Sequence, residues 1–312
     1  MRTQSFRAMG SACRIVVDGG STHLVDEACE LIRRLESKWS RFLLDSEVTQ
    51  ANQNAGNITI VSNETFDLFS HAVDAQTLSH GLFNPLMLDQ LVDLGYDAPW
   101  QDRHVVPVPS AGTCAQPALS DAIVLLDEIS AVIVPQGAAF DPGGIGKGLA
   151  ADLVTEFLVD HGATSTSVEL GGDLRVSGES WYATEWRIGI ANPFDPATDI
   201  ATFSPQHGAV ATSSTLRRRW AAGHEQRHHL LDPTTGRSAD TDLVAVSACS
   251  TAAWWAEVAA KSALIAGSSR AVDLLCEFGT PGVAVAADGT VFSTHAAAAT
   301  TVLSPPREMA MS

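Results

Sequence analysis

The hydrophobic positions of this chain fall into two patterns, and each predicts a different kind of secondary structure. Apolar residues three or four positions apart predict amphipathic helices at residues 24–35 and 149–158, and an alanine-rich run predicts a third at 253–266. Short apolar runs bounded by turn residues predict strands at 13–17 and 244–248. The periodicity by itself therefore indicates a fold that mixes helices and strands.

Further elements are predicted from capping and turn residues. Asn63 is placed to cap a helix. Pro85 is predicted in the first turn of a short helix that reaches Gly95. Paired strand segments around central turn residues predict hairpins at 123–134 and 283–292.

Four stretches carry no strong apolar pattern. Residues 39–52 are predicted as a helix end and a loop, and residues 192–206 as a polar excursion between strands. Residues 97–121, rich in Pro, Gly, Ala and polar residues, predict a linker or surface excursion. The arginine run at 217–219 is predicted to lie on a solvated helix face.

One glycine-rich stretch, F-D-P-G-G-I-G-K-G at residues 140–148, stands directly before a predicted helix. Glycine lets the backbone approach a ligand closely, and the amides and dipole of a helix start favour an anion. A second glycine pair, at 171–172, follows a predicted strand and precedes Asp173. We expect these two glycine corners, with Asp141 and Asp173, to share a cleft.

The glycine-rich stretch does not match two common phosphate-binding motifs. A P-loop requires Ser or Thr after the lysine, but Gly148 follows Lys147. A dinucleotide fingerprint requires a third glycine where this chain has Leu149. A tight turn that only starts a helix therefore stays an equally open alternative.

The composition limits the classes of partner. The 312 residues suggest one large domain or two closely packed ones. A net charge of −17 argues against a nucleic-acid partner, which would normally meet a basic patch. An anionic ligand would therefore need a local cluster of donors or a metal ion.

The cysteines and the apolar runs bear on the compartment. The five cysteines are scattered and include no C-x-x-C pair, so neither a disulfide framework nor a thiolate metal site is expected. No run of 18 apolar residues predicts a membrane span, and the start of the chain has no apolar signal region. We expect a cytoplasmic protein.

Histidine appears in an unusual setting in H-H-L-L-D-P-T-T-G, at residues 228–236. The Asp-Pro pair followed by glycine predicts a turn. Histidine is the side chain best suited to move a proton near neutral pH, so His229 is a candidate base. The alternative is a histidine that only satisfies the adjacent turn.

Taken together and in order, six segments resemble the motifs of the FAD:protein FMN transferases, the ApbE-type flavin transferases. The segments are A-M-G-S at 8–11, S-R-F-L-L-D-S-E at 40–47, G-L-F-N-P at 81–85, the glycine-rich stretch with G-G-D at 171–173, T-S at 212–213 and H-L-L-D-P at 229–233. The resemblance runs from Met9 to the closing hairpin.

The resemblance implies a fold and a reaction. The fold is α+β, a two-lobed domain of mixed, mostly antiparallel sheets flanked by helices, with a central FAD cleft. It would occupy residues 1–303 as a single domain, with a C-terminal tail at 304–312. The reaction joins FMN from FAD to a threonine or serine of a target protein and releases AMP, assisted by Mg²⁺.

The resemblance also implies roles for individual residues. His229 would be the catalytic base, and Asp232 would fix its orientation. Gly144 would offer its carbonyl to the metal ion, and Glu257 and Lys261 stand where the family has its metal-ligating side chains. The residues expected to contact FAD are Met9, Phe83, Asn84, Asp141, Lys147 and Leu231.

The chain departs from the family's pattern at the metal site. Glu257 can still ligate a metal ion, but the ammonium of Lys261 is a donor and cannot. The four-residue spacing also fits an ordinary surface ion pair between these two side chains. Metal use therefore stays open, as do two other functions: an FAD-binding protein without transfer activity, and a hydrolase that splits FAD with water.

Overall fold

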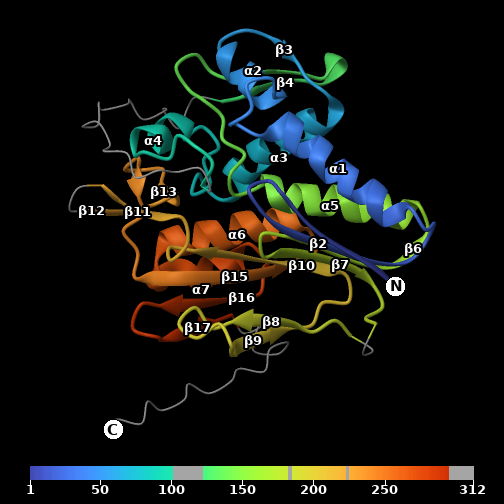
Figure 1. Cartoon of the computed structure of the whole chain (residues 1–312). Coiled ribbons are helices and arrows are strands. Elements are labelled where there is room, and N and C mark those ends of the chain that lie inside the picture. Colours follow the sequence, from blue (N-terminus) through green and yellow to red (C-terminus); the bar gives the residue numbers. More distant parts are fainter. Residues whose placement is uncertain (101–121, 182–184, 223–224, 295–312) are drawn as a thin grey trace.

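A computed structural model describes residues 1–100, 122–181, 185–222 and 225–294. Its centre is an eight-stranded sheet in which every neighbouring pair of strands runs antiparallel (Figure 1). In spatial order the strands are β1 (Arg2–Ala8), β2 (Ser11–Gly19), β6 (Ala163–Leu170), β7 (Asp173–Gly178), β10 (Gly208–Ser214), β15 (Leu243–Ser250), β16 (Gly282–Ala286) and β17 (Val291–Ser293). The fold class is therefore α+β, as predicted.

Helices cover one face of this sheet, and a hairpin covers the other (Figure 1). The helices α5 (Gly146–Asp160) and α6 (Ala253–Ala266) lie against the central strands, flanked by α1 (Leu24–Trp39) and α7 (Ser268–Glu277). The hairpin on the other face is formed by β8 (Ile188–Ala191) and β9 (Asp199–Phe203).

The two faces are buried because side chains alternate along each strand. On β10, Ala209 and Ala211 face the helices, while Val210 packs with Ile190 and Phe203 of the hairpin. All five of these residues are buried. The sheet is therefore the middle of three layers.

A second group of elements lies above the helices in Figure 1. It consists of α2 (Glu47–Gln53), α3 (Asn63–Leu78), α4 (Leu88–Asp93) and a small sheet of β3 (Thr59–Ile60), β5 (Ala131–Ile133) and β4 (Val124–Leu126), with a short 3₁₀ turn at Asp127–Ile129. Two short hairpins, β11 (Arg219–Ala222) with β12 (Glu225–His228) and β13 (Leu231–Asp232) with β14 (Arg237–Ser238), complete the described elements.

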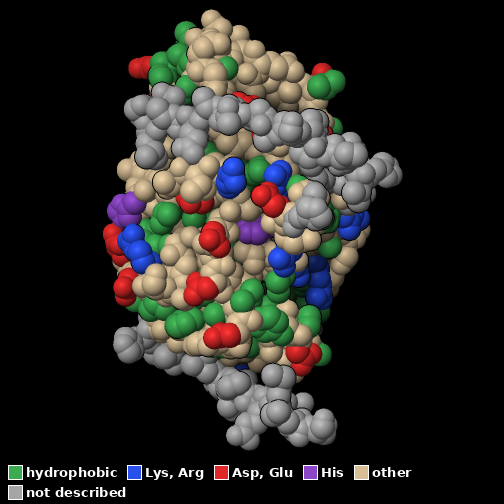
Figure 2. Space-filling model, turned by 90° about the vertical axis from the view of Figure 1, so that its left-hand side faces the viewer, with side chains coloured by type: hydrophobic (Ala, Val, Ile, Leu, Met, Phe, Trp, Pro, Cys, Tyr) green, Lys and Arg blue, Asp and Glu red, His purple; other side chains and the backbone are tan. Residues whose placement is uncertain are grey.

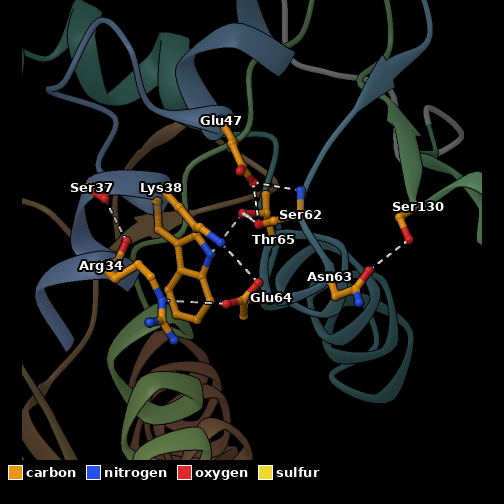
Figure 3. A network of polar contacts seen from close by, with 10 residues as sticks. Arg34, Ser37, Lys38, Glu47, Ser62, Asn63, Glu64, Thr65 and Ser130 are labelled. Atoms are coloured by element: carbon orange, nitrogen blue, oxygen red, sulfur yellow. Dashed lines mark hydrogen bonds and ion pairs between the residues drawn. The ribbon is translucent and has the colours of Figure 1, made fainter. Parts of the chain in front are cut away.

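Polar contacts fix α1, α2 and α3 against one another (Figure 3). Glu47 of α2 accepts hydrogen bonds from the amide and hydroxyl of Ser62, at 3.0 and 2.7 Å. The buried indole of Trp39 donates to Thr65 of α3 at 3.2 Å. These contacts hold in place the loop between α1 and α2, which carries Arg41.

The chain just before the glycine-rich stretch is also held firmly. The amide side chain of Asn52 donates to the carbonyl of Phe140 at 2.9 Å and accepts from its amide at 2.8 Å. The ring of Phe140 stacks on Phe69, with 4.1 Å between centroids, and both rings are fully buried. The backbone that leads into Asp141 is therefore fixed from two sides.

Several sequence predictions are confirmed by these elements. The predicted helices correspond to α1, α5 and α6, and the predicted strands and hairpins to β2, β15, β4–β5 and β16–β17. Other predictions are wrong. Ser62, not Asn63, is the N-cap residue of α3, and Pro85 lies three residues before α4 rather than inside it.

The segments predicted to lack regular structure gave most of the errors. Residues 39–52 contain most of α2, and residues 192–206 contain β9. The run at 217–219 belongs to a turn and the start of β11, not to a helix. Residues 101–121 of the predicted linker and the tail at 304–312 lie outside the described residues, as does the predicted domain limit at residue 303.

Candidate active site

The glycine-rich stretch forms a corner that leads directly into α5. Gly144 has a φ of +98°, a conformation that residues with side chains rarely adopt. Gly148 lies in the first turn of the helix, where an added Cβ would stand 2.5 Å from the carbonyl oxygen of Ala253. Glycine is therefore needed here to let the starts of α5 and α6 touch.

These two helices cap each other. Glu257 of α6 accepts a hydrogen bond from the amide of Gly148 at 2.8 Å. Asp152 of α5 accepts from the amides of Ala253 and Trp254 at 2.9 and 3.0 Å. The anion expected at the start of α5 is thus supplied in part by the protein's own carboxylate, Glu257.

Lys147, in the first turn of α5, links the first glycine corner to the second. Its ammonium forms ion pairs with Asp173, beside the second corner, and with Glu257 of α6. Asp173 also accepts from the amide of Thr212 at 3.2 Å. Both carboxylates are buried, so the cluster combines one cation with two acids in a poorly solvated place.

The cluster shifts the pKa of its members. Burial opposes the charged form of Lys147, but the two carboxylates outweigh it and raise the pKa of the ammonium. For Asp173, burial dominates and raises the pKa to about 6, although Lys147 opposes this change. Asp173 therefore gains a proton in mildly acidic solution more readily than an ordinary aspartate.

Lys261 reaches the first corner from α6. Its Nζ donates to the carbonyl of Gly143 at 3.1 Å and stands 5.1 Å from the centroid of the Phe83 ring. A Cβ on Gly144 would lie 2.8 Å from its Cδ. Burial lowers the pKa of this ammonium, partly offset by Asp141 and Glu257. Glu257 pairs with Lys147 instead, so the surface ion pair considered from the spacing is not formed.

Asp141 is held by Arg41. The guanidinium Nε lies 3.3 Å from Oδ1 of Asp141, and both side chains are largely buried. Arg41 also donates to the carbonyl of Tyr96 at 2.9 Å and stacks over the Tyr96 ring. This buried pair connects the first corner to the loop between α1 and α2.

His229 follows directly after β12, and its Nδ1 is enclosed. Among the described residues, this nitrogen has no hydrogen-bond partner. Burial lowers the pKa of the imidazole well below 6.5, and the nearby positive charges of Arg218 and Lys261 lower it further. The imidazole is therefore held in its neutral form, in which one ring nitrogen carries no proton.

Asp232 does not make the contact predicted for it. Its Oδ1 accepts from the amide of Thr234 at 2.8 Å, which closes the turn after β13. No hydrogen bond joins it to His229 within the part of the chain that the structure describes. The orienting role of Asp232 stays a prediction without a supporting contact.

The remaining predicted FAD contacts lie on several elements. Met9, with a φ of 51°, forms the turn between β1 and β2. Asn84 is buried beside Phe83 and accepts from the amide of Leu86 at 2.9 Å. Leu231 is buried in an apolar cluster that includes Tyr96, the residue that stacks on Arg41. The predicted residues therefore come from both ends of the chain and its middle.

The groups at the predicted metal site do not suit Mg²⁺. This ion takes oxygen ligands in octahedral geometry. The carbonyl of Gly143, next to the predicted ligand Gly144, accepts from Lys261, and a Cβ on Gly144 would lie 2.9 Å from the ammonium nitrogen, so a positive charge stands where the ion would bind. Both oxygens of Glu257 are engaged, by Lys147 and by the amide of Gly148. Among the described residues, no group of three or more His, Cys, Asp and Glu side chains could hold a metal ion.

Sequence reasoning did not assign a role to Arg41 or Arg218. Arg41 lies in the S-R-F segment, and a search for a cation to pair with Asp141 would have drawn attention to it. Arg218 has a φ of 48° and sits close enough to His229 to lower its pKa. The arginine run that contains Arg218 suggested a solvated helix face. The turn before β11, which the sequence did not predict, brings Arg218 toward His229.

On the face shown in Figure 2, Lys and Arg side chains lie scattered among Asp and Glu rather than forming a continuous basic area. No helix within the described ranges is long and apolar enough to cross a membrane.

A hollow of about 660 Å³ lies away from these residues. Its lining includes Asp18, Thr164, Trp181, Trp186 and His207, at the end of β7 that is remote from the glycine corner at 171–172. None of the predicted site residues lines it, so it does not belong to the site described above.

Comparison with known proteins gives a consistent result. The sequence model of the ApbE family matches residues 9–285 of this chain. An FAD:protein FMN transferase of Klebsiella pneumoniae (strain 342) is 30% identical over 80% of this chain and 78% of its own length. One of Treponema pallidum (strain Nichols) is 27% identical over 88% of this chain and 81% of its own length.

Solved structures show the same fold. The ApbE protein of Thermotoga maritima superposes with a TM-score of 0.84 at 23% identity, over 96% of this chain and 98% of its own. The flavin transferase ApbE of Vibrio cholerae gives a TM-score of 0.80 at 22% identity, over 96% and 98% of the two chains.

Proposed function

This chain belongs to the ApbE family, and on that premise we propose that it is an FAD:protein FMN transferase. It would move FMN from FAD to the hydroxyl of a threonine or serine in a target protein and release AMP. Curated relatives that share most of their length with this chain carry that name, which supports the assignment.

One observation in the site carries the proposal. Lys147 lies in the first turn of α5, and Lys261 donates to the carbonyl of Gly143, so both ammonium groups belong to the glycine corner. Both positive charges act on the neutral imidazole of His229. Phosphoryl transfer requires mainly positioning and neutralisation of charge. The two lysines provide positive charge to position and neutralise the phosphates, and His229 provides a proton acceptor beside them.

The proposed step uses these groups in a simple order. The hydroxyl oxygen of the target bonds to the phosphorus of the FMN half, and the bond from that phosphorus to the bridging oxygen breaks. AMP leaves with the bridging oxygen and its electron pair. The proton of the hydroxyl passes to His229, while Lys261 donates a hydrogen bond to a phosphate oxygen.

The other predicted residues would hold FAD in place. Phe83, Asn84 and Leu231 are buried and would contact the flavin or adenine portion, as would Met9 from its turn. Asp141, fixed by Arg41, would accept a hydrogen bond from a polar group of the nucleotide. The cytoplasmic location stays a prediction.

The proposal is tested by mass spectrometry. The purified protein is mixed with FAD and a flavodoxin-like or membrane target that bears an acceptor threonine. The target should gain the mass of one FMN less one water, while AMP appears. Release of AMP and FMN without a modified target would favour the hydrolase. Binding of FAD without any product would favour a binding protein.

His229→Ala should lower the rate of transfer by about 10²–10⁴-fold and leave FAD affinity unchanged, because the imidazole moves a proton and does not hold the nucleotide. Since its pKa is depressed, wild-type activity should not decline around pH 6.5, where an ordinary histidine gains its proton. Full activity in the variant would remove His229 from the mechanism.

A further inference from the structure

The ammonium of Lys261 is fixed against the first glycine corner by contacts from two segments. It donates to the carbonyl of Gly143 and lies 5.1 Å from the centroid of the Phe83 ring. A side chain on Gly144 would collide with it, since an added Cβ would lie 2.9 Å from Nζ. Glycine at position 144 therefore leaves the space that the Lys261 side chain occupies.

Lys261 is also the cation at this corner with donors to spare. Lys147 is committed to Asp173 and Glu257, and Arg41 to Asp141. In the described part of the chain, no carboxylate lies within 4.0 Å of the Lys261 nitrogen, and one of its three N–H groups donates to Gly143. Two donors remain for an incoming anion.

The charges around the corner balance only when Lys261 is counted. The three cations Lys147, Lys261 and Arg41 stand beside the three acids Asp141, Asp173 and Glu257. Without Lys261 the same groups would carry one excess negative charge. The pyrophosphate of FAD is a dianion, so such a site would need an added cation before it could accept the nucleotide.

A divalent ion and Lys261 compete for the same place. The Gly143 carbonyl accepts from the ammonium, and a dication approaching that oxygen would meet a fixed positive charge. The oxygens of Glu257 are engaged on both sides. The oxygen ligands that a magnesium ion requires are therefore already engaged, and the ammonium of Lys261 supplies positive charge in place of the ion.

We propose that Lys261 serves as a built-in cation for the pyrophosphate of FAD, so that FAD binding and FMN transfer proceed without a divalent metal ion. This inference rests on the proposed function. The ammonium donates to a non-bridging phosphate oxygen and balances the charge that passes to AMP as the phosphorus–oxygen bond breaks. Lysine acts on phosphate as a point charge in this manner.

The test measures FAD binding by calorimetry in EDTA and in millimolar Mg²⁺. For the wild-type protein the two dissociation constants should agree within about twofold. Lys261→Thr, which offers an oxygen ligand and no charge, should bind FAD about 10- to 100-fold more weakly in EDTA, the worth of a hydrogen bond to a charged group, and recover in Mg²⁺.

Two more variants at the same position separate charge from ligation. Lys261→Arg keeps the charge and should bind FAD equally well in EDTA and in Mg²⁺. Lys261→Met has neither charge nor ligand and should bind weakly in both. Lys38→Thr, a lysine paired with Glu64 away from the corner, is the control and should behave as the wild type.

The outcomes distinguish this inference from the function on which it rests. If the wild-type protein binds and transfers flavin only in Mg²⁺, or if Lys261→Thr matches it in both solutions, the built-in cation is refuted and the transferase assignment stands. If the wild-type protein binds no FAD in either solution, the proposed function itself fails.

Discussion

At the scale of single residues, the site depends on charged groups that are buried in pairs. Arg41 and Asp141 are the clearest case, with side chains 7% and 12% exposed and 3.3 Å between Nε and Oδ1. A buried carboxylate without a partner is costly because it loses its hydration and gains nothing in return. Arg41 is therefore a positioning residue for Asp141.

Arg41→Met should lower the free energy of unfolding by about 3–5 kcal/mol, because it leaves the buried carboxylate of Asp141 unpaired. The double variant Arg41→Met with Asp141→Asn should recover much of this loss. Urea denaturation measures both. Arg33→Met is the matched control, since the exposed pair of Arg33 with Glu30 should be worth at most about 1 kcal/mol. Equal losses from Arg41→Met and Arg33→Met would contradict the argument.

At the scale of elements, the position of the site follows from how α5 and α6 meet. Each helix lacks a capping side chain of its own at its start. Each instead receives a carboxylate from the other: Glu257 on Gly148, and Asp152 on Ala253 and Trp254. This exchange sets the distance between the glycine corner and Lys261.

Asp152→Ala should cost about 2–4 kcal/mol of stability, because it removes both caps of α6 and the ion pair with Arg175. FAD affinity should fall as well, since the first turns of α6 carry Glu257 and Lys261. Chemical denaturation and FAD titration provide the measurements. Glu156→Ala, an exposed change on the same helix, should stay within about 0.5 kcal/mol of the wild type. A comparable loss in that variant would show that the caps are not the cause.

At the scale of the whole molecule, the site connects distant parts of the chain. The loop with Arg41, the starts of α5 and α6, and the segment after β12 all contribute charged or titratable residues. A ligand held by all of them stabilises the folded chain as a unit, because it binds the native state and not the unfolded one.

FAD at a hundred times its dissociation constant should stabilise the protein by about 2.7 kcal/mol, which corresponds to a rise in Tm of roughly 5 °C. FMN or AMP alone should give smaller shifts at equal concentration, since neither carries the pyrophosphate. Thermal denaturation followed by circular dichroism measures the shift. His229→Ala should keep it, and Asp141→Ala should reduce it. An equal shift with FMN alone would argue against a pyrophosphate site at the glycine corner.

The sequence alone determined the elements whose signal is local. The apolar spacing located α1 and α5, the alanine-rich run located α6, and the turn residues located the β4–β5 and β16–β17 hairpins. The glycine pairs also predicted the two corners. Helix period, strand alternation and a positive φ each depend on a few neighbouring residues, so they can be read directly along the chain.

Only the tertiary structure decided which side chains form ion pairs and helix caps, and which polar segments form strands. The sequence did not reveal that Lys147 would take both Asp173 and Glu257, that Asp152 would cap α6, or that Arg41 would hold Asp141. It also did not reveal β9, which gains stability from packing under the sheet beside Val210. These contacts join residues far apart along the chain. Their energy depends on burial and on the charges that surround each group after folding, and no local pattern contains that information.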